Sequence, residues 1–202
     1  MTNQEIGAPP HPQPWPDDPR LDPELLAHGD RRNVEDKYRY WTVEAIKADL
    51  DKTRHDIHIA IENWQHDMNI GTIVRNANAF NVAAVHIIGK RHWNRRGAMV
   101  TDRYLDIFHH PTVDDFIKAV GDRPLIAVDN QPGAVALHEA DLPQGAVLVF
   151  GGEGPGLSPE MIAASRQMVA IPQFGSTRSV NVGVASGIIL YEWTRRHILT
   201  NL

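Results

Sequence analysis

Residues 171–193 read IPQFGSTRSVNVGVASGIILYEW, and this stretch decides how the last part of the chain is expected to fold. A short apolar run ends at Ile171, a loop of small and polar residues follows, and an apolar helical pattern begins at Val182. The loop leaves backbone N–H and C=O groups uncovered, and the helix directs its unpaired N–H groups at the same place. The junction therefore predicts a site for a small ligand.

Upstream of this junction, short apolar runs alternate with helical patterns, which is typical of an α/β domain with a mostly parallel sheet flanked by helices. The expected strands are Ile57–Glu62, Ala84–Ile88, Leu125–Asp129, Val147–Phe150 and Met168–Ile171. The expected helices are Ile70–Phe80, Val113–Ala119, Pro159–Ser165 and Val182 to about Leu199. Ser158 followed by Pro159 favours a helix start, because serine caps a helix and proline suits its first turn.

The N-terminal part of the chain has a different composition. Seven of the fourteen prolines fall within the first 23 residues, which excludes an ordinary helix or strand there. We expect a proline-rich flexible arm over residues 1–33 and a helical extension over 34–56, where apolar residues recur at helical spacing. Residues 57–202 would form the α/β domain, since 202 residues with 42% hydrophobic content suit one core.

Composition excludes several classes of site. The chain has no cysteine, which rules out disulfides, thiolate metal ligands and cysteine nucleophiles. The eleven histidines show no metal-ligand spacing, so we predict no metal. No signal peptide and no apolar run long enough for a bilayer is evident, and we expect a cytoplasmic protein. With a net charge of −5, nucleic acid could be bound only through a local basic patch.

One such patch is the segment 89–103, which reads GKRHWNRRGAMVTDR. Its basic residues are Lys90, Arg91, Arg95, Arg96 and Arg103, with His92 and Trp93 among them and Asp102 as the single acid. Basic groups combined with an aromatic ring suit phosphate contact and base stacking. A solvated surface loop would have the same composition, so both interpretations stay open.

Another motif follows the first expected strand. Asn69 occupies the cap position of the next helix, and Arg75 comes six residues later. The Arg75 guanidinium could reach the carboxyl edge of the sheet, where ligands of α/β proteins collect. A capping asparagine and an unrelated surface arginine would give the same spacing.

The segment 147–158, VLVFGGEGPGLS, is an apolar strand that runs into a glycine-dense turn containing Glu153. Glycines at a strand end allow the backbone to pass close to a ligand. A Rossmann nucleotide loop is excluded because only 46 residues follow Gly156, too few for the remaining strands and crossovers. A P-loop is excluded because no Lys-Ser or Lys-Thr pair follows. A tight turn in which Glu153 caps the next helix remains an alternative.

The three motifs together resemble those of the SpoU (TrmH) branch of the SPOUT superfamily, the trefoil-knotted RNA 2′-O-methyltransferases. Asn69 and Arg75 match its first motif, an Asn followed six residues later by Arg. The turn Gly151–Leu157 matches the second motif, G-x-E-G-x-G-[LM].

The third motif of the family is Ile-Pro, a loop, then Ser-Leu-Asn-Val-Ser-Val-Ala and an apolar helix ending in Tyr-Glu. This chain has Ile171-Pro172, then SVNVGVA over residues 179–185, and Tyr191-Glu192. Val180 replaces the motif's Leu and Gly183 replaces its second Ser. The resemblance covers about Ile57 to the C-terminus.

The resemblance implies an α/β fold with a deep C-terminal trefoil knot, in which the last segment is tucked through a preceding loop. It also implies S-adenosylmethionine as the cofactor. The cofactor would lie among the loops after Asp129, Phe150 and Ile171, contacted largely by backbone groups of Gly151, Ile171 and Val180.

The implied reaction is methylation of a ribose 2′-hydroxyl in RNA, with tRNA favoured and rRNA possible. Arg75 would act on the hydroxyl, as a base or by gripping the adjacent phosphate, and the positioning groups would be Asn69, Glu153, Ser179 and Asn181. A catalytically idle RNA-binding protein of the same fold is the alternative, and the retention of these residues argues against it.

The resemblance further implies a homodimer that pairs through the terminal helix. On that helix Val184, Ile188, Tyr191 and Ile198 recur at helical spacing, and Gly187 permits close packing. Burial in the core of a monomer would explain the same stripe.

Overall fold

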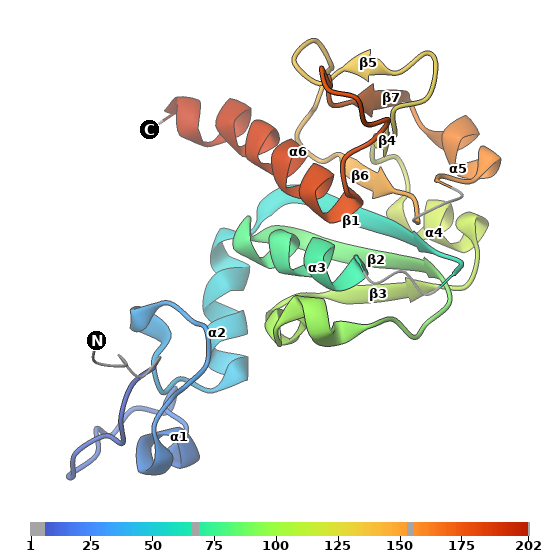
Figure 1. Ribbon diagram of the computed structural model, residues 1–202. Helices are drawn as coiled ribbons and strands as arrows, with labels where there is room; N and C mark the ends of the chain where they lie inside the picture. Colours follow the sequence, from blue (N-terminus) through green and yellow to red (C-terminus); the bar gives the residue numbers. More distant parts are fainter. Residues whose placement is uncertain (1–6, 66–68, 153–155, 202) are drawn as a thin grey trace. The chain divides into compact units, whose positions relative to one another are not determined.

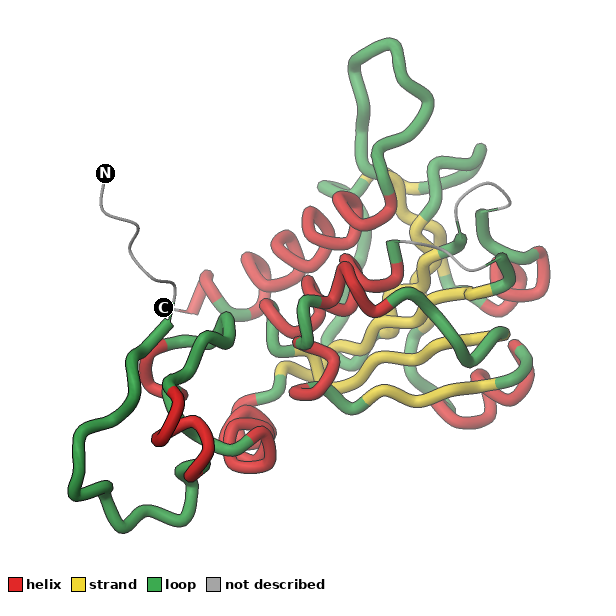
Figure 2. Tube along the Cα trace, turned by 60° about the horizontal axis from the view of Figure 1, so that its bottom comes forward, coloured by secondary structure: helices red, strands yellow, loops and turns green. Residues whose placement is uncertain are grey.

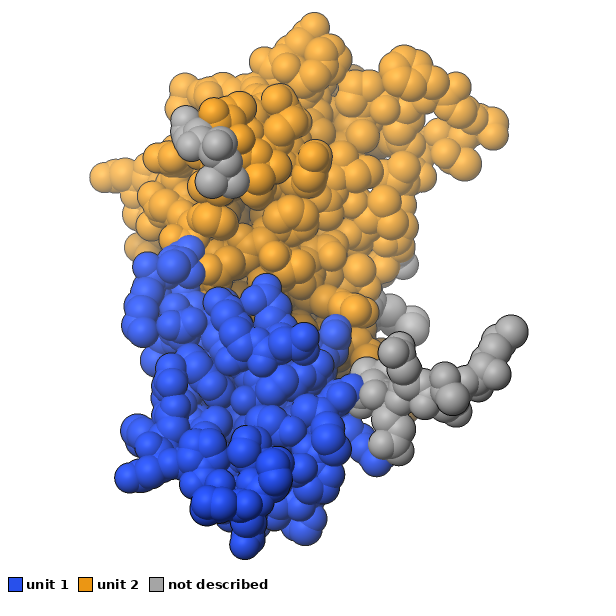
Figure 3. All heavy atoms as spheres, turned by 90° about the vertical axis from the view of Figure 1, so that its left-hand side faces the viewer, with its two compact units in different colours: residues 1–53 blue, residues 54–202 orange. Residues whose placement is uncertain are grey.

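The computed structural model describes residues 7–65, 69–152 and 156–201. The chain divides between Thr53 and Arg54 into two compact units, which Figure 3 distinguishes by colour. The first unit contains helices α1 (Pro23–His28) and α2 (Val43–Leu50), with short 3₁₀ turns at Asp36–Tyr38 and Asp51–Thr53. Helix α1 begins with Pro23 in its first turn and is capped by the Asp22 carboxylate.

A buried carboxylate holds the first unit together. Asp30 is fully buried and accepts hydrogen bonds of 2.7–3.0 Å from the backbone and guanidinium of Arg32 and from the backbone N–H of Tyr40. Burial raises the pKa of the Asp30 carboxyl, but these hydrogen bonds outweigh it and bring the pKa to about 2. Asp30 also pairs with Ala8 through the backbone, so the proline-rich segment is attached to the rest of this unit.

The second unit contains a seven-stranded sheet in the order β3-β2-β1-β6-β4-β7-β5, in which every neighbouring pair is parallel (Figure 1). The strands are β1 (His55–Asn63), β2 (Val82–Gly89), β3 (Ile107–His110), β4 (Leu125–Val128), β5 (Val135–Ala136), β6 (Val147–Phe150) and β7 (Gln167–Ala170). Because the strands are parallel, all their carboxyl ends lie at one edge of the sheet, and the loops after them can build a common site.

Helices cover both faces of this sheet. Helices α3 (Ile70–Ala79) and α6 (Val182–His197) share one core cluster with Ile59, Ile61 and Phe150. Helices α4 (Val113–Val120) and α5 (Pro159–Ala164) share a second cluster on the other face. The loop from β7 to α6 projects beyond the layered body, as Figure 2 shows. No helix among the described residues is long and apolar enough to cross a membrane.

The expected α/β class is confirmed, and each expected strand and helix of this unit agrees with the structure to within two residues at either end. Ser158 starts α5 as expected, because its hydroxyl accepts the backbone N–H of Met161. Strands β3 and β5 were missed. Strand β3 reads IFHH, so two of its four residues are histidines and no apolar run marks it, and β5 has only two residues.

Three histidines form a hydrogen-bonded row across β1, β2 and β3. His86 lies within 2.9 Å of His58 on one side and of His110 on the other, ring nitrogen to ring nitrogen. Phe116 of α4 packs edge-on against two of these rings. Burial lowers the pKa of His86 to about 3 and that of His58 to about 4. The row is therefore neutral in the folded protein at pH 7.

We expect acid to destabilise the fold through His86. Its folded-state pKa lies below the unfolded value near 6.5, so the unfolded chain binds more protons and stability falls as the pH drops through that window. Protonation of His86 alone should lower the free energy of unfolding by about 1–2 kcal/mol between pH 7 and pH 5, above the range in which most carboxylates titrate. Urea unfolding at the two pH values measures this loss.

The substitution His86→Gln should reduce that loss, whereas the same change at the exposed His138 should leave it unaltered. An identical loss in wild type and His86→Gln would contradict this explanation.

Candidate functional site

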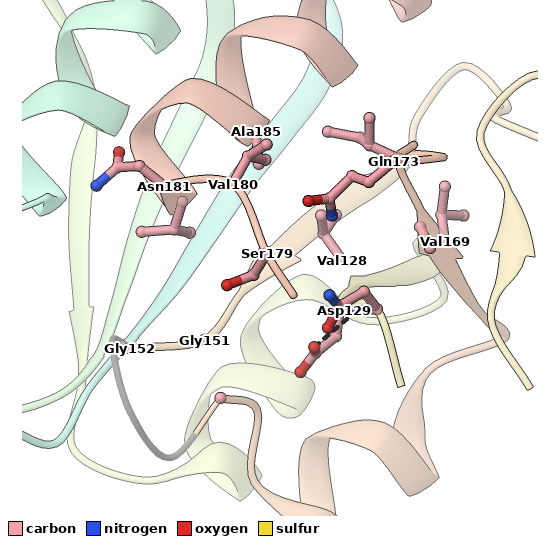
Figure 4. Close-up of a pocket in the computed structure, with 15 residues that line it drawn as sticks. Val128, Asp129, Gly151, Gly152, Val169, Gln173, Ser179, Val180, Asn181 and Ala185 are labelled. Carbon is pink, nitrogen blue, oxygen red and sulfur yellow. Dashed lines mark hydrogen bonds between the residues drawn. The ribbon is translucent and has the colours of Figure 1, made fainter. Parts of the chain in front are cut away.

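A cavity of about 480 Å³ opens where three strand ends meet the start of α6 (Figure 4). Its walls come from the ends of β4, β6 and β7, from the β7–α6 loop and from the first turn of α6. The expected residues that line it are Asp129, Gly151, Ile171, Ser179, Val180 and Asn181. Its volume falls within the roughly 300–1,000 Å³ of small-molecule sites.

The glycine-dense turn after β6 folds back on itself. Gly151 is buried against the backbone of Gly156, and a Cβ atom at Gly151 would collide with that backbone. Gly156 has φ +69°, a conformation that L side chains rarely adopt. Gly151 and Gly156 both line the cavity, so backbone forms this wall, as the motif predicts. Phe150 is fully buried one residue earlier, and the expected Glu153 lies outside the described residues.

A buried amide oxygen on the cavity wall has no hydrogen-bond partner among the described residues. Oε1 of Gln173 accepts no hydrogen bond within the part of the chain that the structure describes. In Figure 4 the Gln173 side chain lies beside Val128 and Ala185, whose surfaces are apolar. A buried acceptor without a donor is costly, so this atom suits a ligand that brings an N–H or O–H group. No sequence motif pointed to Gln173.

At the end of β4, the Asp129 carboxylate accepts hydrogen bonds from the backbone N–H of Asn130 (2.7 Å) and from the amide of Gln131 (2.9 Å). The Asn130 amide donates to the carbonyl of Arg178. The loop after β4 is thereby tied to the loop before α6, although 48 residues separate them.

The first and third motifs meet at the start of α6. The Asn181 amide donates to the Asn69 side-chain oxygen at 2.9 Å. The oxygen of the same amide caps α6 by accepting the backbone N–H groups of Gly183 (2.9 Å) and Val184 (3.3 Å). Asn69 does occupy the cap position of α3, but its side chain makes no capping bond there. The predicted cap position is thus confirmed, whereas the alternative of a merely capping asparagine does not describe the side chain, which bonds to Asn181 at the start of α6.

Asn76 makes a second bond between these helices. Its amide donates to the carbonyl of Gly183 (2.8 Å) and to the hydroxyl of Ser186 (2.9 Å), which is fully buried. Close approach requires small residues, since a Cβ at Gly183 would lie 2.8 Å from a methyl carbon of Thr72. Asn76 and Ser186 were not predicted from the sequence. Each is a polar residue on the apolar face of a helical pattern, and that position was the signal for a buried polar contact.

Arg75 lies on α3 one turn after Gly71 and is exposed. It forms no hydrogen bond or ion pair with any other residue that the structure describes. A guanidinium carries five N–H donors that suit an anionic ligand, and Arg75 lies on the helix whose cap position Asn69 occupies. Ser179 and Val180 are exposed as well, on the segment that leads into α6.

The basic segment 89–103 packs against the start of α3. It contains the 3₁₀ turns Arg95–Ala98 and Thr101–Tyr104, and a Cβ at Gly71 of α3 would lie 2.8 Å from Cα of Gly97. The five basic side chains, Lys90, Arg91, Arg95, Arg96 and Arg103, are all exposed. The segment thus presents its charge beside the helix that carries Arg75.

Trp93 of this segment is only partly exposed. Its ring packs against the core cluster under α3 and α6, and the Arg95 guanidinium lies 5.5 Å from the ring centroid. Arg95 also approaches Asp102 at 3.4 Å.

As for metals, no group of three or more His, Asp or Glu residues gathers in the described part of the chain in a way that could hold an ion.

Comparison with known proteins agrees with this geometry. Residues 56–191 match the profile of the SpoU rRNA methylase family. The chain is 28% identical over 152 residues to the tRNA (guanosine(18)-2'-O)-methyltransferase of Escherichia coli K12. The matched region covers 73% of this chain and 66% of the length of that protein, so the chain spans slightly less than two thirds of this relative.

Two solved structures share the fold. One is a TrmH/SpoU tRNA-modifying enzyme from A. aeolicus, with a TM-score of 0.69 and 25% identity over 79% of this chain and 84% of that one. The other is an AdoMet-bound rRNA methyltransferase from Sinorhizobium meliloti, with a TM-score of 0.64 and 24% identity over 74% of this chain and 60% of that one.

The family profile covers most of the chain and all three motifs, so the predicted resemblance is confirmed and implies the C-terminal knot. The chain belongs to the SpoU rRNA methylase family.

Proposed function

We propose that this protein transfers the methyl group of S-adenosylmethionine to a ribose 2′-hydroxyl of RNA in the cytoplasm. The Asn69–Asn181 contact carries the proposal, because it joins the helix of Arg75 to the loop that lines the cavity. A tRNA is the favoured substrate, since the E. coli relative is named for a tRNA guanosine, and rRNA is the other class.

The cavity residues fit the cofactor. Adenosine needs apolar walls with a few polar groups at its edges, and the cavity supplies Val128, Val169 and Ala185 together with the unpartnered Oε1 of Gln173. Gly151 and Val180 line the cavity, which supports the proposed backbone contacts of these residues to the cofactor. Bound S-adenosylmethionine would supply an electrophilic methyl group on a sulfonium sulfur.

Arg75 is proposed to act on the ribose. The 2′-oxygen forms a bond to the methyl carbon as the carbon–sulfur bond breaks, S-adenosylhomocysteine leaves, and the hydroxyl proton passes to solvent water. A guanidinium is effectively always protonated, so Arg75 serves better as a donor to the developing alkoxide and the adjacent phosphate than as a base. Asn69, Ser179 and Asn181 would then align the ribose with the methyl group. Glu153 keeps its proposed positioning role from the family motif.

Methyl transfer tests the proposal directly. The protein is incubated with methyl-labelled cofactor and separate tRNA and rRNA pools, and the labelled nucleotide is mapped. Label on a ribose 2′-oxygen is the expected result. Tight binding of RNA without label in any pool would instead support the alternative, an idle RNA-binding protein.

Replacing Arg75 by Ala should lower methyl transfer by at least about 100-fold, because the developing charge loses its donor. Binding of S-adenosylhomocysteine, measured by calorimetry, should change little, since Arg75 is not among the cavity-lining residues. The matched control is Arg166→Ala, an exposed arginine at the start of β7 that should retain activity. Normal turnover by the Arg75 variant would refute this role.

The basic segment is proposed to bind RNA phosphates. Neutralising Arg91 and Arg96 together as Gln should flatten the dependence of RNA affinity on salt, since each lost phosphate contact removes about 0.7–0.9 from the logarithmic slope. Filter binding at several salt concentrations measures the slope. An unchanged slope would favour the alternative of a solvated surface loop with no part in RNA binding.

A homodimer that pairs through α6 is proposed from the family resemblance and from the exposed apolar side chains of this helix. Val184, Ile188 and Tyr191 are 54%, 39% and 54% exposed, so burial in the monomer core does not explain this part of the stripe. Ile198 does pack against the core. An exposed apolar row on a helix suits a partner surface.

Sedimentation should therefore find a dimer at micromolar concentration. Ile188→Glu should shift it to monomer, because the charge would be buried at the interface. The control Val135→Glu, at an exposed position of β5, should remain dimeric. A monomeric wild type would contradict the proposed dimer.

A further inference from the structure

Trp64 presents a fixed, partly exposed aromatic ring just after β1. Its side chain is 37% exposed, yet its indole N–H already donates to Oε1 of Glu62 at 3.2 Å. The ring lies directly against Gly89 of β2, where a Cβ would come within 2.6 Å of it. Gly89 has φ +95° and lacks the side chain that would displace the ring. The exposed part of the ring is therefore an apolar surface whose polar group is already used.

Glu62 connects this tryptophan to the candidate site. The Glu62 carboxylate is fully buried and accepts the backbone N–H and the hydroxyl of Ser158, both at 2.7 Å. Ser158 follows the glycine-dense turn that forms one wall of the cavity. One carboxylate thus holds both the indole of Trp64 and the end of that turn.

Strand register places Trp64 at the edge of the sheet where the cavity opens. Ile61 of β1 lies opposite Phe150 of β6, and Gly151 of the cavity wall comes immediately after Phe150. On the other side, Lys90 of the basic segment donates its backbone N–H to the Asn63 carbonyl at 2.9 Å. The ring therefore lies between a segment with exposed positive charge and the wall of the cavity.

Trp93, the aromatic residue of the basic segment, offers less free ring surface for base stacking than Trp64. Trp93 packs against the core cluster and has Arg95 over its ring, so part of its surface is already covered. Trp64 has one face on a glycine and no cation over it among the described residues. Rigid aromatic rings beside basic grooves bind nucleobases by stacking, without reading their identity.

We propose that Trp64 is a stacking platform for one base of the RNA substrate, which orients the strand so that the target ribose reaches Arg75. This inference rests on the proposed function and adds a binding subsite to it. The partner is the π-face of a nucleobase, and the basic segment holds the neighbouring phosphates.

The test compares Trp64→Leu with Trp64→Phe. Leucine removes the aromatic ring and should weaken binding of unfractionated tRNA roughly 5- to 100-fold, the range for a lost base stack. Phenylalanine keeps a ring and should recover most of the affinity. The salt slope should stay at the wild-type value in both, because no phosphate contact is lost. Affinity for S-adenosylhomocysteine should also stay unchanged.

The matched control is Phe108→Leu. Phe108 is 49% exposed on β3, but it lies in register with His86 rather than at the strand ends. This variant should bind tRNA as the wild type does. Thermal unfolding of each variant shows whether a loss of affinity comes from a loss of the fold.

A double-mutant cycle identifies the stacked base. Once the methylated nucleotide is mapped, abasic sites are placed at its neighbours one at a time. At one position the abasic RNA should weaken binding to wild type but not to Trp64→Leu, since the two changes remove the same contact. Equal losses in both proteins at every position, or wild-type affinity of a folded Trp64→Leu, would overturn the proposal. Absence of methyl transfer by the wild type would instead count against the proposed function.

Discussion

The contact between α3 and the start of α6 is the constraint on which the site depends. Two amides make it: Asn76 donates to Gly183 and Ser186, and Asn181 donates to Asn69. Glycine permits the approach, because a Cβ at Gly183 would press on Thr72. These bonds fix where α6 begins, and the loop before α6 forms one wall of the cavity. One junction therefore joins the cavity wall to the helix that carries Arg75.

The local sequence pattern was sufficient to predict the strands and helices that form this junction. Strand β6, the start of α3 and the start of α6 lie where apolar runs and motif spacing predict them. The partners of the polar side chains were harder to predict, because they are decided by contacts across more than 100 residues. Asn69 illustrates this, since spacing predicts its cap position correctly but leaves open whether its side chain caps α3 or bonds elsewhere, and in the fold it bonds to Asn181. Spacing along the chain carries no information about which of the two bonds is formed.

Two tryptophans likewise show that the local sequence predicts elements better than it predicts the contacts of a side chain. Trp93 stands among basic residues and looks like the base-stacking group, yet its ring packs on the core. Trp64 has no basic residue beside it in sequence, and only the pairing of β1 with β2 brings it next to Lys90. The buried carboxylate of Glu62 likewise appears as the last residue of an apolar strand until its bonds to Ser158 and Trp64 are seen. Parallel strand ends collect such residues from distant motifs.

If the α3–α6 junction shapes the cavity in which S-adenosylmethionine is proposed to bind, a change at Asn76 should alter cofactor binding although this residue does not line the cavity. The measurement is calorimetric affinity for S-adenosylhomocysteine of Asn76→Ala, with folding verified by circular dichroism. Two lost hydrogen bonds at the junction should weaken binding about tenfold through displacement of the loop. A folded Asn76→Ala that binds S-adenosylhomocysteine as tightly as the wild type would contradict the account.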